Sequence, residues 1–190
     1  MKTSTTMKRN KTLKTVLALS LMATVMTSCS SDDDTPEVVN EEEIITTMTV
    51  TLTSADATAI LQSQDLDGDG PDAPVITADN LTANTTYTGS IELLNETETP
   101  AEDITEEVEE EADEHQFFFD LNGSLTEVTY SDEDGDGNPV GLEFELTTGD
   151  AGSGTITITL RHEPTKPNDG TLADAGGETD IAQTFSVTVE

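Results

Sequence analysis

Hydrophobic and polar residues alternate with a period of two over much of the chain beyond residue 43. The clearest case is the stretch 44–53, in which one face is made of Ile44, Thr46, Met48, Val50 and Leu52. Successive side chains of a strand point to opposite faces, so this alternation predicts a half-buried β-strand.

Weaker versions of this pattern predict further strands at 57–64, 87–94, 116–121, 125–131, 141–148, 154–162 and 180–190. The inward positions of the last two are expected to be Ile156, Ile158, Leu160, His162, Ile181, Phe185, Val187 and Val189. The strands 116–121 and 125–131 flank the turn 122–124 and are expected to pair as a hairpin. About eight antiparallel strands joined by Gly, Asn and Asp turns predict a mostly β fold, an immunoglobulin-like β-sandwich.

One segment, 99–115, has a helical period instead. Its apolar face is made of Ile104, Val108, Ala112 and His115. Thr99 is the expected N-cap, Pro100 suits the first helical position, and Glu102 completes a capping box. The sequence therefore predicts one short acidic helix on the sandwich.

The N-terminus has the layout of a secretory signal. Basic residues precede an apolar run, 16–26, which is followed by Thr27, Ser28 and Cys29. This layout resembles that of bacterial lipoproteins, whose lipobox cysteine is acylated and becomes the mature N-terminus. The alternative is an ordinary cleaved signal with a chance cysteine, but Cys29 is the only cysteine in the chain.

The resemblance implies three regions: a lipoprotein signal peptide at 1–28, an acidic tether at 29–43, and a single domain at 44–190. It also implies a membrane anchor on Cys29 and a place in the cell envelope. We expect an outer-membrane lipoprotein that faces either the periplasm or the cell surface.

Charge is segregated along the chain. Five of the seven Lys and Arg residues precede Cys29, and all 40 Asp and Glu residues follow it. Two basic residues against 40 acidic ones give the mature chain a net charge of −38. Such a surface repels nucleic acid and attracts cations, so we expect no nucleic-acid partner.

The stretch 131–143, SDEDGDGNPVGLE, matches the calcium-loop pattern D-x-D-x-D-G-x5-E. A calcium ion would take its oxygen ligands from Asp132, Asp134, Asp136, Asn138 and Glu143. The flanking segments read as strands rather than as the helices of an EF-hand, so the element is interpreted as a strand–loop–strand. The alternative is a solvated turn that uses Asp, Gly and Asn for its backbone conformation.

A second acidic loop repeats part of the pattern. Asp65, Asp67 and Asp69 have the same spacing, but Ile76 stands where the closing carboxylate belongs. This loop is a weaker calcium candidate.

The mature chain has two histidines, His115 and His162, each at the end of an expected apolar face. They are candidates to converge on zinc or another transition metal, with Glu114, Glu163 or Asp120 as further ligands. The alternative is that each is a hydrogen-bonded residue at the edge of the core. The two histidines do not have the close spacing that is typical of zinc ligands.

Signs of catalysis are weak. The chain has no G-x-S-x-G elbow and no Gly-rich phosphate loop before a helix, and lipidation would remove its only thiol. We therefore expect a protein that is not an enzyme.

The blocks EEEADEHQFFF, YSDEDGDGNPVGLEF and GGETDIAQTFSVTVE resemble those of small flavobacterial-type lipoproteins of the Bacteroidota. Members of this group are sometimes labelled as the type 1 periplasmic binding fold superfamily, which implies a ligand-binding role. That fold is a large two-lobed α/β architecture, and about 150 strand-rich residues favour the sandwich instead.

Together these features predict a lipid-anchored binding or accessory module of the cell envelope, with calcium as the candidate ligand. The alternatives are a structural or adhesive surface lipoprotein, or an accessory partner of an outer-membrane uptake receptor with a His-based metal site.

Overall fold

The computed structural model describes residues 43–68 and 70–190, and in this part of the chain a mostly β fold is confirmed. Ten strands of the described residues form two antiparallel sheets, accompanied by two short helices, as expected for a β-sandwich. The narrower assignment to the immunoglobulin-like arrangement is not confirmed. The predicted signal peptide 1–28, the lipidation site Cys29, the tether up to residue 42 and Asp69 lie outside the described residues.

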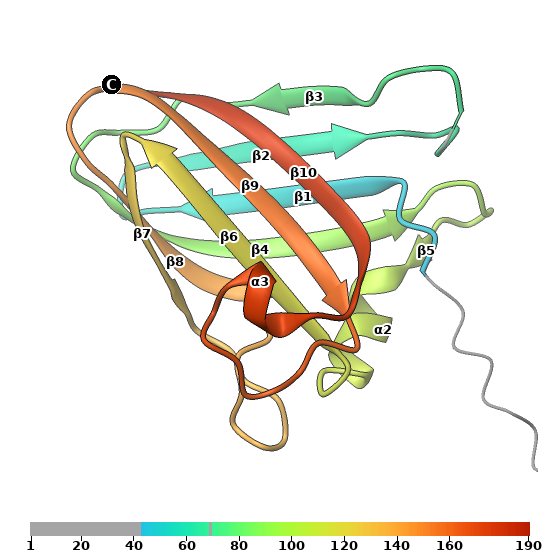
Figure 1. Ribbon diagram of the computed structural model, residues 1–190. Coiled ribbons are helices and arrows are strands. Elements are labelled where there is room, and N and C mark those ends of the chain that lie inside the picture. The colour runs from blue at the N-terminus through green and yellow to red at the C-terminus, as the bar shows by residue number, and fades with distance from the viewer. Residues whose placement is uncertain (1–42, 69) are drawn as a thin grey trace, which may run out of the picture. The chain divides into compact units, whose positions relative to one another are not determined.

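The larger sheet has the order β3–β2–β1–β4–β8–β7, with the short β5 paired to β4. Its strands are β1 (Thr47–Thr53), β2 (Thr58–Gln64), β3 (Val75–Ala78), β4 (Thr86–Asn95), β5 (Glu102–Asp103), β7 (Leu125–Tyr130) and β8 (Glu143–Thr148). The smaller sheet has the order β10–β9–β6 and consists of β6 (His115–Gly123), β9 (Gly152–His162) and β10 (Glu178–Val189). Its three strands cross the strands of the larger sheet at an angle (Figure 1).

The core lies between the two sheets and follows the period-two pattern. Met48 and Phe144 from the larger sheet and Phe117, Ile158 and Phe185 from the smaller sheet are all 0% exposed. Burial of each such side chain contributes about 1.5–3 kcal/mol. The expectation for Ile44 is wrong: it is 62% exposed, because β1 begins only at Thr47.

The predicted hairpin of 116–121 with 125–131 is also wrong. β6 pairs with β9 in the smaller sheet, whereas β7 pairs with β8 in the larger one. The turn at Ser124 therefore carries the chain from one sheet to the other. Both strands are present as predicted, but local turn residues do not reveal which neighbour each strand takes.

The acidic helix α2 (Ile104–Glu110) is shorter than predicted. Its N-cap is Asp103, whose side chain accepts a hydrogen bond from the Thr105 N–H at 3.0 Å. The expected start at Thr99 is lost because β5 pairs Glu102 with Asn95 of β4. The predicted apolar face is correct at Ile104 and Val108, which are buried.

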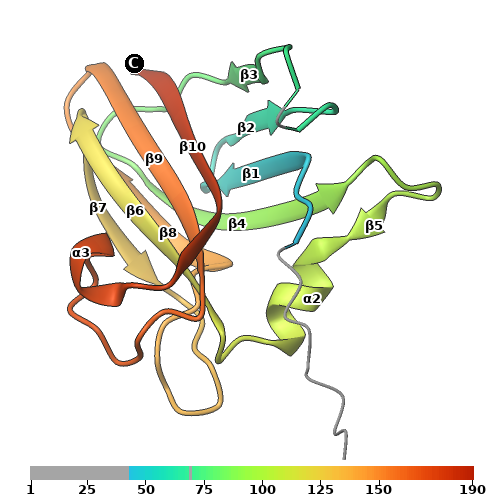
Figure 2. The same cartoon turned by 45° about the vertical axis from the view of Figure 1, so that its right-hand side comes forward.

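A second helix, α3 (Leu172–Ala175), is a single turn between β9 and β10. Within the described part of the chain, neither helix has the length and apolar character needed to cross a bilayer. Figure 2 shows α2 and α3 at the end of the sandwich where β6 begins and β9 ends.

Candidate metal centre

Four ionisable side chains converge at the end of the sandwich where β6 begins. They are Glu43, His115, His162 and Asp180, and one ligand atom from each lies within 4.8 Å of all the others. His115 is the first residue of β6, His162 is the last residue of β9, and Asp180 lies near the start of β10. Glu43 comes from the irregular segment that precedes β1.

The two histidines meet because they are cross-strand partners. The β6–β9 register places His115 opposite His162, and both follow the inward face of their strands. Side chains of directly opposed residues are close enough to touch. The ring centroids lie 4.7 Å apart, with the ring planes at 82°.

Asp180 reaches the histidines because β10 has a bulge. Thr179 pairs with Arg161 and Ile181 pairs with Leu160, so Asp180 is the extra residue between two paired positions. Regular alternation from the inward Ile181 would turn Asp180 to the outer face. A bulge re-aims a side chain locally, and here it sends the carboxylate inward.

Gly177 allows β10 to begin beside the end of β9. Its φ is +70°, and a Cβ at this position would lie 2.3 Å from the His162 carbonyl oxygen. A larger residue would push the two chain segments apart, which would separate Asp180 from His162.

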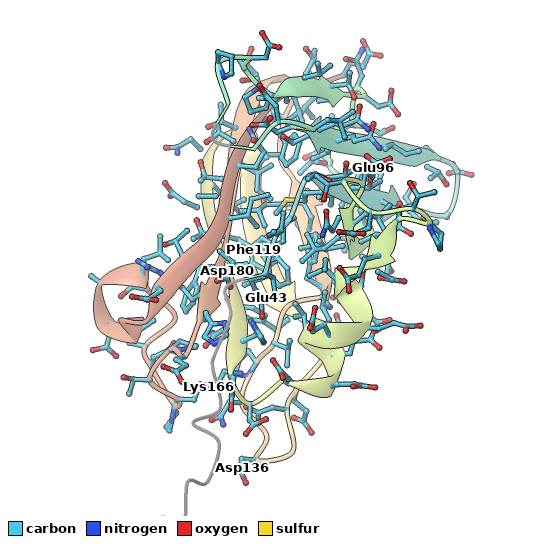
Figure 3. All side chains as sticks on the ribbon, turned by 90° about the vertical axis from the view of Figure 1, so that its right-hand side faces the viewer. Glu43, Glu96, Phe119, Asp136, Lys166 and Asp180 are labelled. Carbon is cyan, nitrogen blue, oxygen red and sulfur yellow. The ribbon has the colours of Figure 1, made fainter. Side chains whose placement is uncertain are left out.

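Glu43 is placed by the residues that follow it. The Thr46 N–H donates to the Leu94 carbonyl at 3.0 Å, and the Thr46 hydroxyl oxygen accepts from the Glu96 N–H at 2.8 Å. These bonds fix the segment against the end of β4. Figure 3 shows Glu43 and Asp180 next to each other, with Lys166 and Asp136 further down.

The distances within the cluster are those of close, partly hydrogen-bonded contacts. His115 Nε2 lies 3.0 Å from Glu43 Oε1 and 4.0 Å from Asp180 Oδ2. His162 Nδ1 lies 3.4 Å from Glu43 Oε2 and 3.9 Å from Asp180 Oδ1. The side chains of His115 and Asp180 are 0% exposed, Glu43 is 4% exposed and His162 is 6% exposed.

A backbone carbonyl orients His115. Its Nδ1 lies 3.1 Å from the carbonyl oxygen of Glu111, the residue that caps the C-terminus of α2. A carbonyl oxygen only accepts, so Nδ1 carries the hydrogen. In the neutral ring, Nε2 then presents its lone pair to Glu43 and Asp180, which is how a metal-binding histidine is commonly held.

The cluster needs positive charge. Glu43 and Asp180 are two carboxylates in a nearly solvent-free site, and buried charges are costly unless they are paired. One divalent cation would balance both charges. The surroundings are acidic as well: burial first, and then the charges of Glu43, Glu102 and Glu111, raise the pKa of Glu107, against a lowering effect of His115.

The separations fit one metal ion. Four ligand atoms placed tetrahedrally at zinc-ligand bond lengths lie about 3.2–3.6 Å from one another. The four N···O distances here, from 3.0 to 4.0 Å, involve both oxygens of each carboxylate, and one ligand atom from each residue lies within 4.8 Å of the other three. Two imidazole nitrogens and two carboxylate oxygens are therefore placed so that they can hold a metal ion with small side-chain movements.

A second set of three residues lies beside the first. His162 shares it with Glu114 and Glu163, both exposed. The Glu163 N–H donates to the Glu114 carbonyl at 2.7 Å and holds these residues together. Two of the three extra ligands considered from the sequence thus lie near His162, whereas Asp120 belongs to neither set.

The acidic loop 131–143 does not form a comparable cluster. All of its residues are described, and no three of its carboxylates bring oxygens within 4.8 Å of one another. Asp132 accepts hydrogen bonds from the N–H groups of Gly141 at 2.7 Å and Glu143 at 3.0 Å. The carboxylate expected at calcium position 1 instead holds the base of the loop together.

Asp134 is also used internally. Its carboxylate accepts from the N–H groups of Asp136 at 3.0 Å and Asn138 at 2.8 Å, and from the Asn138 side-chain amide. Asp136 is exposed in the loop, and Glu143 is exposed on β8. The structure therefore supports the alternative interpretation of this loop as an Asx-type turn more than the calcium site.

A lysine provides the cation of this loop. Lys166 Nζ lies 3.2 Å from Asp134 Oδ2 and donates to the Ala112 carbonyl at 2.6 Å, and its side chain is 6% exposed. Burial raises the pKa of Asp134, but hydrogen bonds from Asn138, Lys166 and Asp136 outweigh it and hold that pKa at about 2. The Lys166 ammonium group therefore balances the charge of Asp134, the role that a bound metal ion would otherwise have.

The second acidic loop shows no metal-ligand grouping among its described residues. Asp67 Oδ2 accepts a hydrogen bond from the Asp72 N–H at 3.3 Å, and the Asp65 N–H donates to the Thr46 carbonyl. Asp69 lies outside the described residues.

Sequence reasoning missed two of the four residues in the cluster. Glu43 was assigned to the tether, and Asp180 was placed on the outer face of its strand by the period-two pattern. Only the glycine pair at 176–177 directly before β10 hinted that the strand begins irregularly.

The sequence matches no known protein family, and no curated protein or solved structure shows significant similarity to it.

Proposed function

We propose that the protein is a lipid-anchored module of the cell envelope that binds one divalent transition-metal ion, zinc in the first instance. The ligands are Glu43 and Asp180 through carboxylate oxygens, His115 through Nε2 and His162 through Nδ1. The convergence of these four side chains, each at most 6% exposed, carries the proposal.

The ligand set selects the class of metal. Imidazole nitrogen suits zinc, copper, iron and nickel, whereas calcium takes six to eight oxygen ligands. One divalent ion also neutralises the two buried carboxylates. A transition-metal ion therefore fits the cluster better than calcium does.

The burial of the cluster favours a non-catalytic role. Catalytic zinc sites keep one coordination position open to water, whereas structural sites are closed by four protein ligands. Here four side chains face one another away from solvent. We therefore propose that the protein holds or carries the ion, as an accessory module, and performs no chemistry on a substrate.

The test is metal content and affinity. The full chain, purified without added metal and then titrated calorimetrically with zinc, is expected to bind one ion. Asp180→Asn is expected to lose most of this affinity, while Asp120→Asn, an exposed carboxylate on β6, retains it. If the wild-type chain shows no zinc binding, the structural or adhesive alternative is favoured.

A further inference from the structure

The four ligands come from two different parts of the fold. His115, His162 and Asp180 all belong to the three-stranded sheet of β6, β9 and β10. Glu43 belongs to the segment that enters β1 of the other sheet. An ion bound by all four would therefore tie the start of the larger sheet to the smaller one.

The Glu43 ligand is held differently from the other three. Residues 43–46 are neither helix nor strand, and Ile44 is 62% exposed. The segment is pinned at Thr46, three positions beyond the carboxylate. Glu43 itself is held in the site through its contacts with the two imidazoles, at 3.0 and 3.4 Å.

Charge decides when this contact is favourable. Glu43 and Asp180 approach the same two imidazoles, and with neutral rings the two carboxylates repel each other at short range. Asp180 is fixed in a paired strand, so Glu43 is the group that can move away. Its departure leaves two histidines and one aspartate, three ligands with an open fourth position.

We infer that Glu43 is a detachable fourth ligand, and that residues 43–45, anchored at Thr46, form a strap which closes over the ion and opens to release it. The inference rests on the proposed function. Metal binding and docking of the strap are then reciprocally coupled. The bound ion stabilises the docked strap, and tension on the chain before β1 lowers the affinity for the ion. An acceptor with its own nitrogen, oxygen or sulfur ligands would take the ion through the opened side.

Two measurements on the full chain test the strap. Hydrogen exchange followed by mass spectrometry is expected to show amides 44 and 45 exchanging at least about tenfold more slowly with zinc than without it. Glu43→Gln is expected to keep one zinc per chain but to release it to a colorimetric chelator at least about tenfold faster than wild type. Asp120→Asn is the control for release, with an unchanged rate.

The outcomes separate the strap from the metal site itself. Absence of zinc binding by the wild-type chain would overturn both proposals. Binding of one zinc with unchanged exchange at amides 44 and 45 would leave the metal site standing and overturn the strap. An equal release rate for Glu43→Gln and wild type would also overturn the strap, and it would reduce the proposed site to its other three ligands, because Glu43 would then not be a ligand.

Discussion

The acidic loop 131–143 and the buried Glu43–His115–His162–Asp180 cluster differ in how they relate to sequence. The loop matches every fixed position of a calcium-binding pattern, yet Asp132 and Asp134 accept hydrogen bonds from backbone N–H groups and Asp134 also pairs with a lysine. The cluster matches no pattern, yet it gathers four candidate ligand side chains around one point. Spacing along the chain shows which carboxylates are neighbours, but it does not show which internal donors compete for them.

Burial accounts for the rest of the difference. In the loop, Asp136 and Glu143 are exposed, so water can solvate their charges. In the cluster, the carboxylates of Glu43 and Asp180 are almost completely removed from water. A buried negative charge creates a demand for a cation that an exposed one does not.

The largest expected effect comes from removing a cluster histidine. With zinc at a thousandfold excess over Kd, binding stabilises the wild-type fold by about 4 kcal/mol, a rise in Tm of about 10 °C. His162→Ala is expected to abolish this rise, as measured by differential scanning calorimetry with and without zinc. Glu143→Gln in the loop serves as the control and should keep the full response; a zinc response retained by His162→Ala would contradict the site.

The next largest effect is expected inside the loop. Asp134→Ala leaves the buried Lys166 ammonium without its carboxylate and should lower the free energy of unfolding by about 3 kcal/mol. Urea denaturation measures this. Asp136→Ala, at an exposed position of the same loop, should change the free energy by less than about 0.5 kcal/mol.

Zinc affinity should be unchanged in both of these loop variants. If Asp134→Ala proved as stable as wild type, or if it lost zinc, the separation of the loop from the cluster would be incorrect.

A smaller effect depends on pH. The folded-state pKa of Asp134 is about 2, below its ordinary value of 3.8, so ionised Asp134 stabilises the fold. This contribution is fully present above pH 4 and is lost as the pH falls through 2; after allowance for solvent screening it is about 1 kcal/mol. The stability gap between wild type and Asp134→Asn should therefore narrow from pH 4 to pH 2 in urea titrations, and a gap that widens would contradict the lowered pKa.

The smallest expected effect is the response to calcium. Since Asp132 and Asp134 already accept hydrogen bonds from donors of the protein, millimolar calcium should shift the Tm no more than the same concentration of magnesium does. Glu143→Gln should behave like wild type in both salts. A calcium-specific rise that Glu143→Gln loses would restore the loop as a calcium site.

The sequence predicted the sandwich well where alternation is strong. Met48, Val50 and Leu52 of β1 and Ile156, Ile158 and Leu160 of β9 are buried as expected, because one face of each strand must exclude water. It failed where pairing is non-local, as in the assignment of β6 and β7 to one hairpin. The helix start at Thr99 failed for a related reason, since pairing of β5 with β4 overrode the local capping signal.

The candidate site was predictable only in part. Inward placement of His162 followed from the apolar period of β9. His115 was expected at the end of the helix but is the first residue of β6, and the register that places it opposite His162 did not follow from the sequence. Asp180 depends on a bulge, which shifts alternation by one residue without any composition signal. Glu43 could not be predicted as a site residue, because it lies in a run of acidic residues that is typical of a solvated tether, although its side chain is buried.

The extra residue in β10 has an evolutionary consequence. Loss of one residue before Asp180, such as Thr179, would restore regular pairing and place Asp180 opposite Arg161, on the face that points away from the imidazoles. Every candidate ligand would remain in the sequence, but the candidate metal centre would lose one of its four side chains. A single-codon insertion or deletion therefore suffices to gain or lose this arrangement. The presence of the same four residue types in another sequence would not show that it has the site.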